Sequence, residues 1–411
     1  MKKLIYWTLF LVVLAACSKD DNDSLELSSD NTYNLDNNEH VLRIGVNSNS
    51  DWTVSGAERW CSTRQLNGDS GDSLIITITP NIAPDQRSVT LSLANKSGSK
   101  TDITIRQAKR DGEYHFRLPV IFHVLYLNPG NPYQNIPANR IEELLDAANS
   151  YYRNYDGQGG DMNLTFELAT RDPDGNPLDE AGIHRVQRYT NYTMECEKFL
   201  ENQYGDIHLM WDPNNYINVF LFEFSESDGS TTGISFLPFT PSSHSLAGLT
   251  PSDSYYTKLP TKQVYGVALN NRYINKLLVY APNSSQDIMA TTLTHELGHY
   301  LGLYHVFSIG EAVESDYCDD TPDYNRQEYM DKWNQNTPWS QAIQRTDRNG
   351  APFTSTNIMD YDFSEKNRFT NDQRTRVRHV LEYSPLIPGP KMPIAISRGA
   401  DMTEKKAITI K

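Results

Sequence analysis

Cysteine, histidine and basic residues are scarce in this chain of 411 residues. It has 4 cysteines and 10 histidines, and 37 lysines and arginines face 52 aspartates and glutamates, which gives a formal net charge of -15. Nucleic-acid binding needs a concentrated basic face, so this balance argues against a nucleic-acid partner. After residue 17 no apolar run is long enough to cross a bilayer. The length exceeds what one hydrophobic core usually serves and predicts two or three domains.

The first 17 residues have the layout of a secretion signal. Two lysines precede a short apolar run, and the run ends in L-A-A-C at Cys17. This ending resembles a bacterial lipobox, in which the signal is cleaved before the cysteine and the cysteine is acylated; a buried or leftover cysteine is the alternative. The following S-K-D-D resembles a tag that exports lipoproteins to the cell surface. We therefore expect a secreted outer-membrane lipoprotein, held to the membrane by its N-terminal lipid and exposed at the surface, with inner-leaflet retention as the alternative.

Residues 18–32 are rich in Asp, Asn and Ser, and we expect a flexible tether there. Residues 33–108 contain short alternating apolar segments separated by turn residues, which predicts an all-β sandwich. The segments D-W-T-V-S, R-W-C, I-T-I-T-P-N, R-S-V-T-L-S-L and I-T-I-R-Q-A resemble the BACON family, whose name suggests glycans as partners. Trp52 and Trp60 are candidate glycan platforms, but packing in the core or at an edge is the favoured interpretation.

A second domain is expected at residues 113–388, followed by a C-terminal tail at 389–411. The near-continuous apolar run from Leu118 predicts a buried strand, and the segment after Pro137 has apolar residues at helical spacing. N-L-T-F-E-L-A and Y-I-N-V-F-L-F predict further strands. This mixture predicts an α+β domain with a mixed sheet.

The stretch H-E-L-G-H-Y-L-G-L-Y-H predicts a zinc site in this second domain. In a helix, His295 and His299 lie four residues apart and share one face, which suits two ligands of one zinc ion. Gly302 can adopt the left-handed conformation that ends the helix, so that His305 supplies a third nitrogen. Three imidazoles leave a fourth position for water, and Glu296 is placed to take a proton from that water. The sequence therefore predicts a catalytic zinc centre rather than a structural one.

The same stretch is the signature of the metzincin metallopeptidases, and N-I-M-D-Y downstream resembles the methionine turn of that clan. The resemblance implies that Met359 forms an apolar floor below the metal and that Tyr361 steadies the oxyanion. Within the clan, G-L-Y-H-V-F, D-Y-C-D-D-T-P, N-I-M-D-Y and R-F-T-N-D-Q-R resemble the pappalysin-like family. That resemblance implies a zinc-dependent endopeptidase acting on proteins or peptides.

Some pappalysin-like proteins carry structural calcium in the D-T-P region, and the resemblance makes four residues candidate calcium ligands: Asp316, Asp319, Asp320 and Thr321. A hydrogen-bonded acidic turn is the alternative. Three cysteines remain beside Cys17, which allows one disulfide among them, and we expect Cys196 to pair with Cys318 because both fall in the later domain.

Two other functions stay open at this point. One is a glycan-binding surface lipoprotein with a non-catalytic zinc domain, and the other is a zinc amidase that acts on cell-wall peptides.

Overall fold

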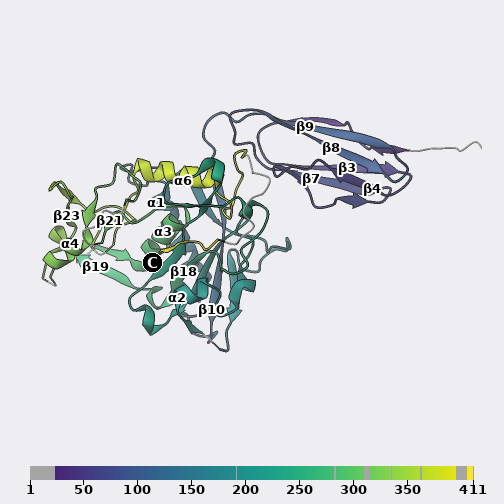
Figure 1. Cartoon of the computed structure of the whole chain (residues 1–411). Coiled ribbons are helices and arrows are strands. Elements are labelled where there is room, and N and C mark those ends of the chain that lie inside the picture. The colour runs from purple at the N-terminus through teal and green to yellow at the C-terminus, as the bar shows by residue number, and fades with distance from the viewer. Residues whose placement is uncertain are drawn as a thin grey trace, which may run out of the picture. The chain divides into compact units, whose positions relative to one another are not determined.

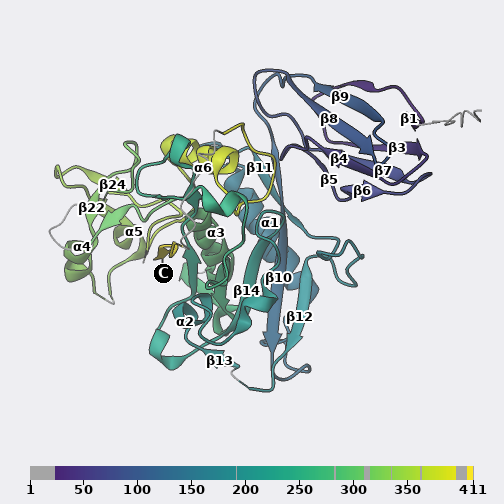
Figure 2. The ribbon, with the colours of Figure 1, turned by 45° about the vertical axis from the view of Figure 1, so that its right-hand side comes forward.

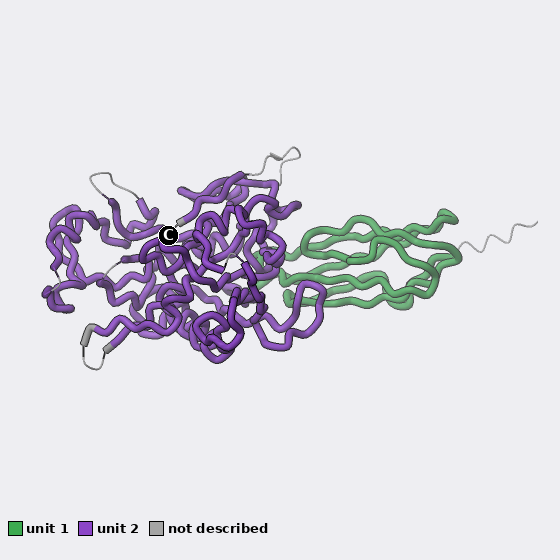
Figure 3. The backbone as a smooth tube through the Cα atoms, turned by 90° about the horizontal axis from the view of Figure 1, so that it is seen from below, with its two compact units in different colours: residues 1–111 green, residues 112–411 purple. Residues whose placement is uncertain are grey.

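The structure is a computed structural model that describes residues 24–190, 192–281, 284–309, 315–334, 336–361, 363–394 and 405–410. The predicted lipobox with Cys17 lies outside these residues. The chain divides into two compact units, residues 1–111 and 112–411, which are coloured separately in Figure 3. Across the described ranges, no helix is both long enough and apolar enough to cross a membrane.

Unit 1 is a sandwich of two β-sheets, as the sequence predicted. Its strands are β1 (Leu25–Leu27), β2 (Thr32–Leu35), β3 (His40–Ser48), β4 (Trp52–Ser55), β5 (Cys61–Thr63), β6 (Asn67–Gly68), β7 (Ser73–Ile78), β8 (Arg87–Asn95) and β9 (Lys100–Gln107). One sheet has the order β1-β3-β7-β5 and the other β2-β9-β8-β4-β6. Alternate residues of these strands are apolar and buried, so the two inner faces form one core.

Trp52 belongs to the core of unit 1. It is fully buried, and its indole Nε1 donates a hydrogen bond to the carbonyl of Asp69 at 2.9 Å. The partly buried Trp60 packs against the same core, and the guanidinium of Arg87 lies 4.3 Å from its ring centroid. Packing therefore accounts for both tryptophans, which supports the interpretation favoured from the sequence.

The prediction of a flexible tether over residues 18–32 is wrong for part of that range. Residues 25–27 form β1, which pairs antiparallel with β3. Leu25 and Leu27 pack against the sandwich core, because the short L-E-L alternation gives this strand one apolar face.

Unit 2 is built on a mixed sheet of order β11-β10-β14-β18-β15-β25, with β12 beside β10 and β13 beside β14 (Figure 2). These strands are β10 (Phe116–Tyr126), β11 (Leu164–Leu168), β12 (Ile183–Gln187), β13 (Thr193–Met194), β14 (Ile217–Phe224), β15 (Gly233–Phe236), β18 (Val267–Asn270) and β25 (Thr409–Ile410). β10, β14 and β18 are parallel neighbours, whereas β15 runs antiparallel to β18. Strand β10 is almost entirely buried, which explains its continuous apolar sequence.

The helices of unit 2 are α1 (Ala138–Tyr152), α2 (Cys196–Leu200), α3 (Ile288–Tyr300), α4 (Arg326–Lys332), α5 (Trp339–Ala342) and α6 (Asn371–Tyr383). Its short strands outside the main sheet are β16 (Phe239–Thr240), β17 (Thr250–Pro251), β19 (Leu277–Ala281), β20 (Ser284–Asp287), β21 (Phe307–Ser308), β22 (Tyr324–Asn325), β23 (Gln344–Thr346) and β24 (Pro352–Thr354). The α+β fold expected from the sequence is confirmed.

Helix α3 lies at the centre of unit 2 (Figure 1). It contacts β15, β18 and α1, and every residue from Met289 to Tyr300 is buried. The side chain of Asp287 caps its first turn by accepting hydrogen bonds from the amides of Met289 and Ala290. Because α3 is buried on every side, dense packing holds it in place, and the helix is a rigid support for its polar residues.

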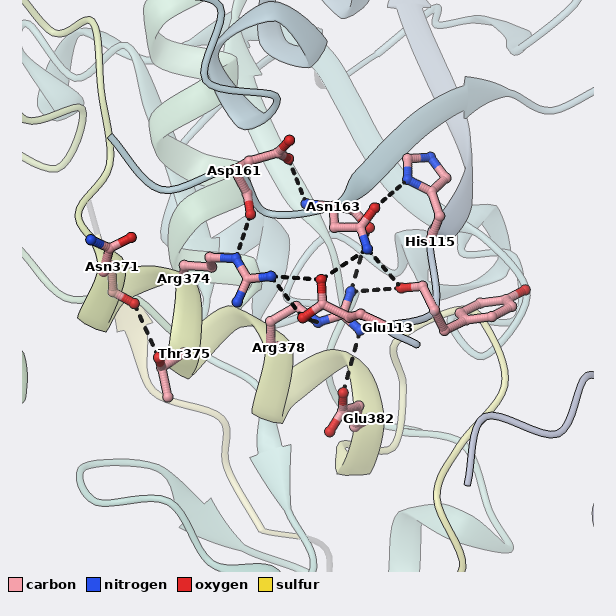
Figure 4. A network of polar contacts seen from close by, with 10 residues as sticks. Glu113, His115, Asp161, Asn163, Asn371, Arg374, Thr375, Arg378 and Glu382 are labelled. Carbon is pink, nitrogen blue, oxygen red and sulfur yellow. Dashed lines mark hydrogen bonds and ion pairs between the residues drawn. The ribbon is translucent and has the colours of Figure 1, made fainter. Parts of the chain in front are cut away.

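A polar network fixes α6 to the beginning of β10 (Figure 4). The carboxylate of Glu113 accepts hydrogen bonds from Arg374 at 2.6 Å and from the side-chain amide of Asn163 at 2.9 Å. Arg378 donates to the carbonyl of Tyr114 at 2.9 Å. Charge-assisted bonds of this kind are stronger than neutral ones, so the network holds α6 in place beside the sheet.

Candidate metal centre

Three histidine nitrogens converge at the end of α3. The Nε2 atoms of His295 and His299 are 3.0 Å apart, and His305 Nε2 lies 3.2 Å from the first and 3.0 Å from the second. Ligands of a tetrahedral zinc at its usual bond length are about 3.3 Å from each other. Among the histidines, cysteines, aspartates and glutamates of the described ranges, these three histidines form the group whose ligand atoms lie close enough together to hold one metal ion.

The hydrogen bonds of the Nδ1 atoms show that the Nε2 lone pairs of His295 and His299 face one another. Nδ1 of His295 lies 2.8 Å from the carbonyl oxygen of Ile358, and Nδ1 of His299 lies 2.8 Å from that of Leu303. A carbonyl accepts only, so each Nδ1 carries the proton and each Nε2 of a neutral ring has a lone pair. Such lone pairs cannot bond to one another, and a cation between them satisfies both. The residues therefore fit a zinc ion.

Burial keeps these imidazoles neutral. It lowers the pKa of His299 to about 4, and it lowers the pKa of His295 and of His305 well below the usual value, with the neighbouring histidines adding to the effect. A neutral imidazole is the form that binds metal, so the site is ready for a ligand at neutral pH.

Gly302 turns the chain from α3 toward His305. Its φ is +94°, in the left-handed region. The amide of Gly302 donates to the carbonyl of His299, and the amide of Leu303 donates to the carbonyl of Gly298, both at 2.9 Å. These two bonds form a Schellman motif, which ends the helix and redirects the chain within three residues.

Glu296 is a buried carboxylate on the same helix. It is 3% exposed, and its Oε2 has no hydrogen-bond partner. Burial raises the pKa of Glu296 well above the usual value, while the nearby charge of Lys366 opposes that rise. The side chain lies against Gly233 at the start of β15, where an added Cβ would be 2.7 Å from Glu296 Cγ. Glu296 is therefore suited to bind and release a proton.

The methionine turn lies directly against the zinc-site helix. Met359 is fully buried, and a Cβ added to Gly298 would be 2.5 Å from its Sδ. The preceding residue, Ile358, supplies the carbonyl that faces His295. The helix therefore needs a glycine between its two histidines. The glycine in H-E-L-G-H could have indicated this close contact, but the sequence analysis gave Gly298 no role.

A pair of side-chain amides links this turn to α6. Asn357 Nδ2 donates to Gln373 Oε1 at 3.0 Å, and Gln373 Nε2 donates to Asn357 Oδ1 at 3.1 Å. Gln373 also completes a capping box with Thr370 at the start of α6. The segments N-I-M-D-Y and R-F-T-N-D-Q-R thus form one unit that holds the metal-site floor.

Tyr361 lies beside the histidines. Its ring centroid is 4.3 Å from that of His305 and 5.5 Å from that of His295, and the guanidinium of Arg326 is 5.4 Å from the Tyr361 ring. The structure therefore brings the predicted tyrosine to the metal site. Arg326 and Lys366 are neighbours of the site that the sequence analysis did not identify, because no local motif marks them.

The acidic segment predicted as a calcium site forms a hydrogen-bonded turn. Asp316 accepts from the Thr321 hydroxyl at 2.6 Å and from the Cys318 amide at 3.1 Å. The amides of Asp319 and Asp320 donate to Asp372 on α6, at 2.9 and 3.3 Å. These contacts match the alternative interpretation of an acidic turn, and calcium at Asp316, Asp319, Asp320 and Thr321 stays a prediction.

The predicted disulfide between Cys196 and Cys318 is not formed, and both residues are buried thiols. The Cys196 amide donates to Asp228 at the start of α2, whereas Cys318 lies in the turn that contacts α6. The two residues share a unit but belong to different parts of it, and shared membership of a domain was the only basis for pairing them.

Unit 2 has a metzincin-type zinc-peptidase fold. It combines a mixed sheet, a buried helix that ends at three converging histidines, and a methionine packed against that helix. Residues 203–382 match the M43 peptidase family, described as "Pregnancy-associated plasma protein-A", and residues 50–108 match the BACON family of N-terminal binding domains. Residues 203–382 are thus similar to the pappalysin-type peptidases, and residues 50–108 are similar to BACON domains.

Individual proteins are similar to parts of this chain. An extracellular metalloprotease of Arthroderma otae is 36% identical over 93 residues, which are 22% of this chain and 31% of that protein. One of Trichophyton verrucosum is 36% identical over 88 residues, 21% of this chain and 29% of that protein. The chain thus matches less than a third of these relatives' length. Tannerella forsythia mature mirolysin in complex with a cleaved peptide has a TM-score of 0.47 and 23% identity, over 65% of this chain and 92% of that one.

Proposed function

We propose that this chain is a zinc-dependent endopeptidase that hydrolyses proteins or peptides. The observation that carries the proposal is the convergence of three Nε2 atoms, from His295, His299 and His305, beside the buried carboxylate of Glu296. A structural zinc site closes all four positions with protein ligands, whereas a three-ligand site with an adjacent base is the arrangement of a hydrolase.

A zinc ion held by these imidazoles supplies Lewis acidity, which acidifies water and polarises a substrate carbonyl. Glu296 accepts the proton that the water loses on attacking the carbonyl carbon, and it returns that proton to the departing amine nitrogen. Its raised pKa suits this exchange, because a buried carboxyl holds the proton between the two steps. The hydroxyl of Tyr361 donates a hydrogen bond to the oxyanion as the carbonyl becomes tetrahedral.

The cellular setting is part of the proposal and is supported by sequence alone. The first 17 residues and the S-K-D-D that follows favour an outer-membrane lipoprotein exposed at the cell surface. The β-sandwich would then lie between the lipid anchor and the peptidase domain, and glycans remain candidate partners of the sandwich.

A substrate panel tests this proposal against its two rivals. The protein without its first 17 residues is loaded with zinc, checked for metal content and incubated with a proteome-derived peptide library and with purified peptidoglycan. Cleavage across the peptide library supports the endopeptidase. Release of cell-wall peptides alone would establish the amidase, and glycan binding that survives chelation without any cleavage would establish the non-catalytic scaffold.

A further inference from the structure

Strand β15 has both of its edges paired, and the outer edge pairs with the chain's own residues 408–410. The inner edge bonds to β18. On the outer edge, Ser235 faces Ile410 and Phe236 faces Thr409 in antiparallel register, and the amide of Leu237 donates to the carbonyl of Ile408 at 2.8 Å. These residues were predicted to be an extended tail, and the structure makes them the last strand of the sheet.

Side chains of unit 2 hold this segment from a second direction. Gln263 Nε2 donates to the carbonyl of Lys405 and Gln263 Oε1 accepts from the amide of Ala407, both at 3.1 Å. The hydroxyl of Tyr255 donates to the same Lys405 carbonyl at 2.8 Å. Ala407 is buried at 4% exposure, whereas Ile408 is 41% exposed. The segment 405–410, which we call the edge strand, is therefore fixed mainly through its backbone.

The outer edge of β15 leads directly to the catalytic carboxylate. Gly233 begins β15, and its Cα is so close to the side chains of Glu296 and Thr292 that a Cβ would lie 2.7 Å from each. In the observed register, a peptide that continued past the position of Ile410 would next face Ile234 and then Gly233. Each residue advances about 3.4 Å along a strand, so two further residues bring the peptide opposite Gly233, the residue against which the Glu296 side chain lies.

We propose that the edge strand inhibits the enzyme by occupying the outer edge of β15, in competition with an extended substrate peptide that pairs with the same edge. The proposal rests on the peptidase function proposed above. An unpaired strand edge offers backbone N–H and C=O groups that any extended peptide can satisfy, so binding there selects unfolded segments with little demand on side chains. Substrate and edge strand need the same hydrogen bonds of β15, and only one of them can occupy that edge at a time.

Displacement of the edge strand should therefore change substrate binding and leave the chemistry unaltered. If the strand occupies the edge for about nine-tenths of the time, its release lowers KM by about tenfold with kcat unchanged. The groups that carry the reaction do not belong to the edge strand, so the effect should appear in KM alone.

Ala407→Glu in the full chain tests the proposal, because a charge at this buried position is incompatible with the bound strand. Ile408→Glu adds the same charge at an exposed position and is the matched control. Gln263→Leu is a second, uncharged variant that removes the hydrogen bonds to Lys405 and Ala407. Hydrogen exchange of the Leu237 amide reports strand release directly, and KM for an extended peptide reports access to the edge.

Faster exchange at Leu237 together with a lower KM in Ala407→Glu and Gln263→Leu, but not in Ile408→Glu, is the expected result. Faster exchange with an unchanged KM overturns the proposal. A third measurement is independent of activity: a fluorescent peptide of sequence K-K-A-I-T-I is titrated onto the Ala407→Glu/Glu296→Ala protein. Saturable binding that an extended substrate peptide displaces supports the proposal even if no variant cleaves anything, and absence of binding overturns it.

Discussion

Replacement of Gly298 by alanine should destabilise unit 2, although alanine is the better helix former. The exchange gains about 1 kcal/mol in helix propensity. The new Cβ, however, would lie 2.5 Å from Met359 Sδ and 3.2 Å from Met359 Cε, where normal contacts are about 3.5 to 4.0 Å. Overpacking of a dense core costs about 1 to 3 kcal/mol and more where backbone must move. We therefore expect a net loss of about 1 to 2 kcal/mol, with weaker zinc binding because His295 and His299 flank the site.

Urea unfolding of unit 2 and zinc competition with a chelator measure these two effects. Gly130→Ala is the control, because its nearest neighbour would be Asn128 Oδ1 at an ordinary 3.5 Å, and we expect a change below about 0.5 kcal/mol. In the Gly298→Ala/Met359→Ala double variant the clash disappears, so the losses of the two single variants should sum to about 2 to 3 kcal/mol more than the loss of the double variant, which is the cost of the overpacking. Additive losses, or a stabilised Gly298→Ala protein, would refute the reasoning.

Three further predictions concern the surroundings of the site. Gln373→Ala removes both hydrogen bonds to Asn357 and should lower the unfolding free energy by about 1 to 3 kcal/mol. The same variant should weaken zinc binding, as measured by chelator competition. Thr375→Ala on the same helix is the control and should not change zinc affinity. Burial lowers the pKa of His123 to about 3, so the stability linked to this neutral ring is complete above about pH 6.5 and falls by about 1.4 kcal/mol per pH unit as the pH falls toward 3. His123→Asn should therefore reduce the slope of the unfolding free energy, measured with urea, against pH over that range. An unchanged slope would contradict the lowered pKa of His123. Tyr361→Phe should reduce kcat by about a hundredfold with zinc content unchanged, and a wild-type kcat would exclude the oxyanion role.

The parts of the site that are local in sequence could be predicted from the sequence. His295 and His299 share a helical face because of their spacing alone, and the left-handed φ of Gly302 follows from the need to end the helix before His305. The strand alternation of unit 1 and the apolar run of β10 likewise follow from local periodicity.

The contacts that join distant segments could not be predicted in this way. The amide pair of Asn357 and Gln373 depends on how the methionine turn and α6 meet. The edge strand was predicted to be a tail because a strand as short as Thr409–Ile410 has almost no periodic signal in its sequence. Its pairing depends on the outer edge of β15, which lies far away in the sequence. The same limit applies to Cys196, because membership of a domain says little about the distance to Cys318.

The most direct test of the central claim is the comparison of wild type with Glu296→Gln on one peptide that the library identifies as a substrate, with zinc content measured in both proteins. Our account predicts equal zinc content and a kcat reduced by about a thousandfold or more, because the amide cannot accept the proton of the attacking water. Cleavage by the zinc-loaded variant at the wild-type rate would contradict it.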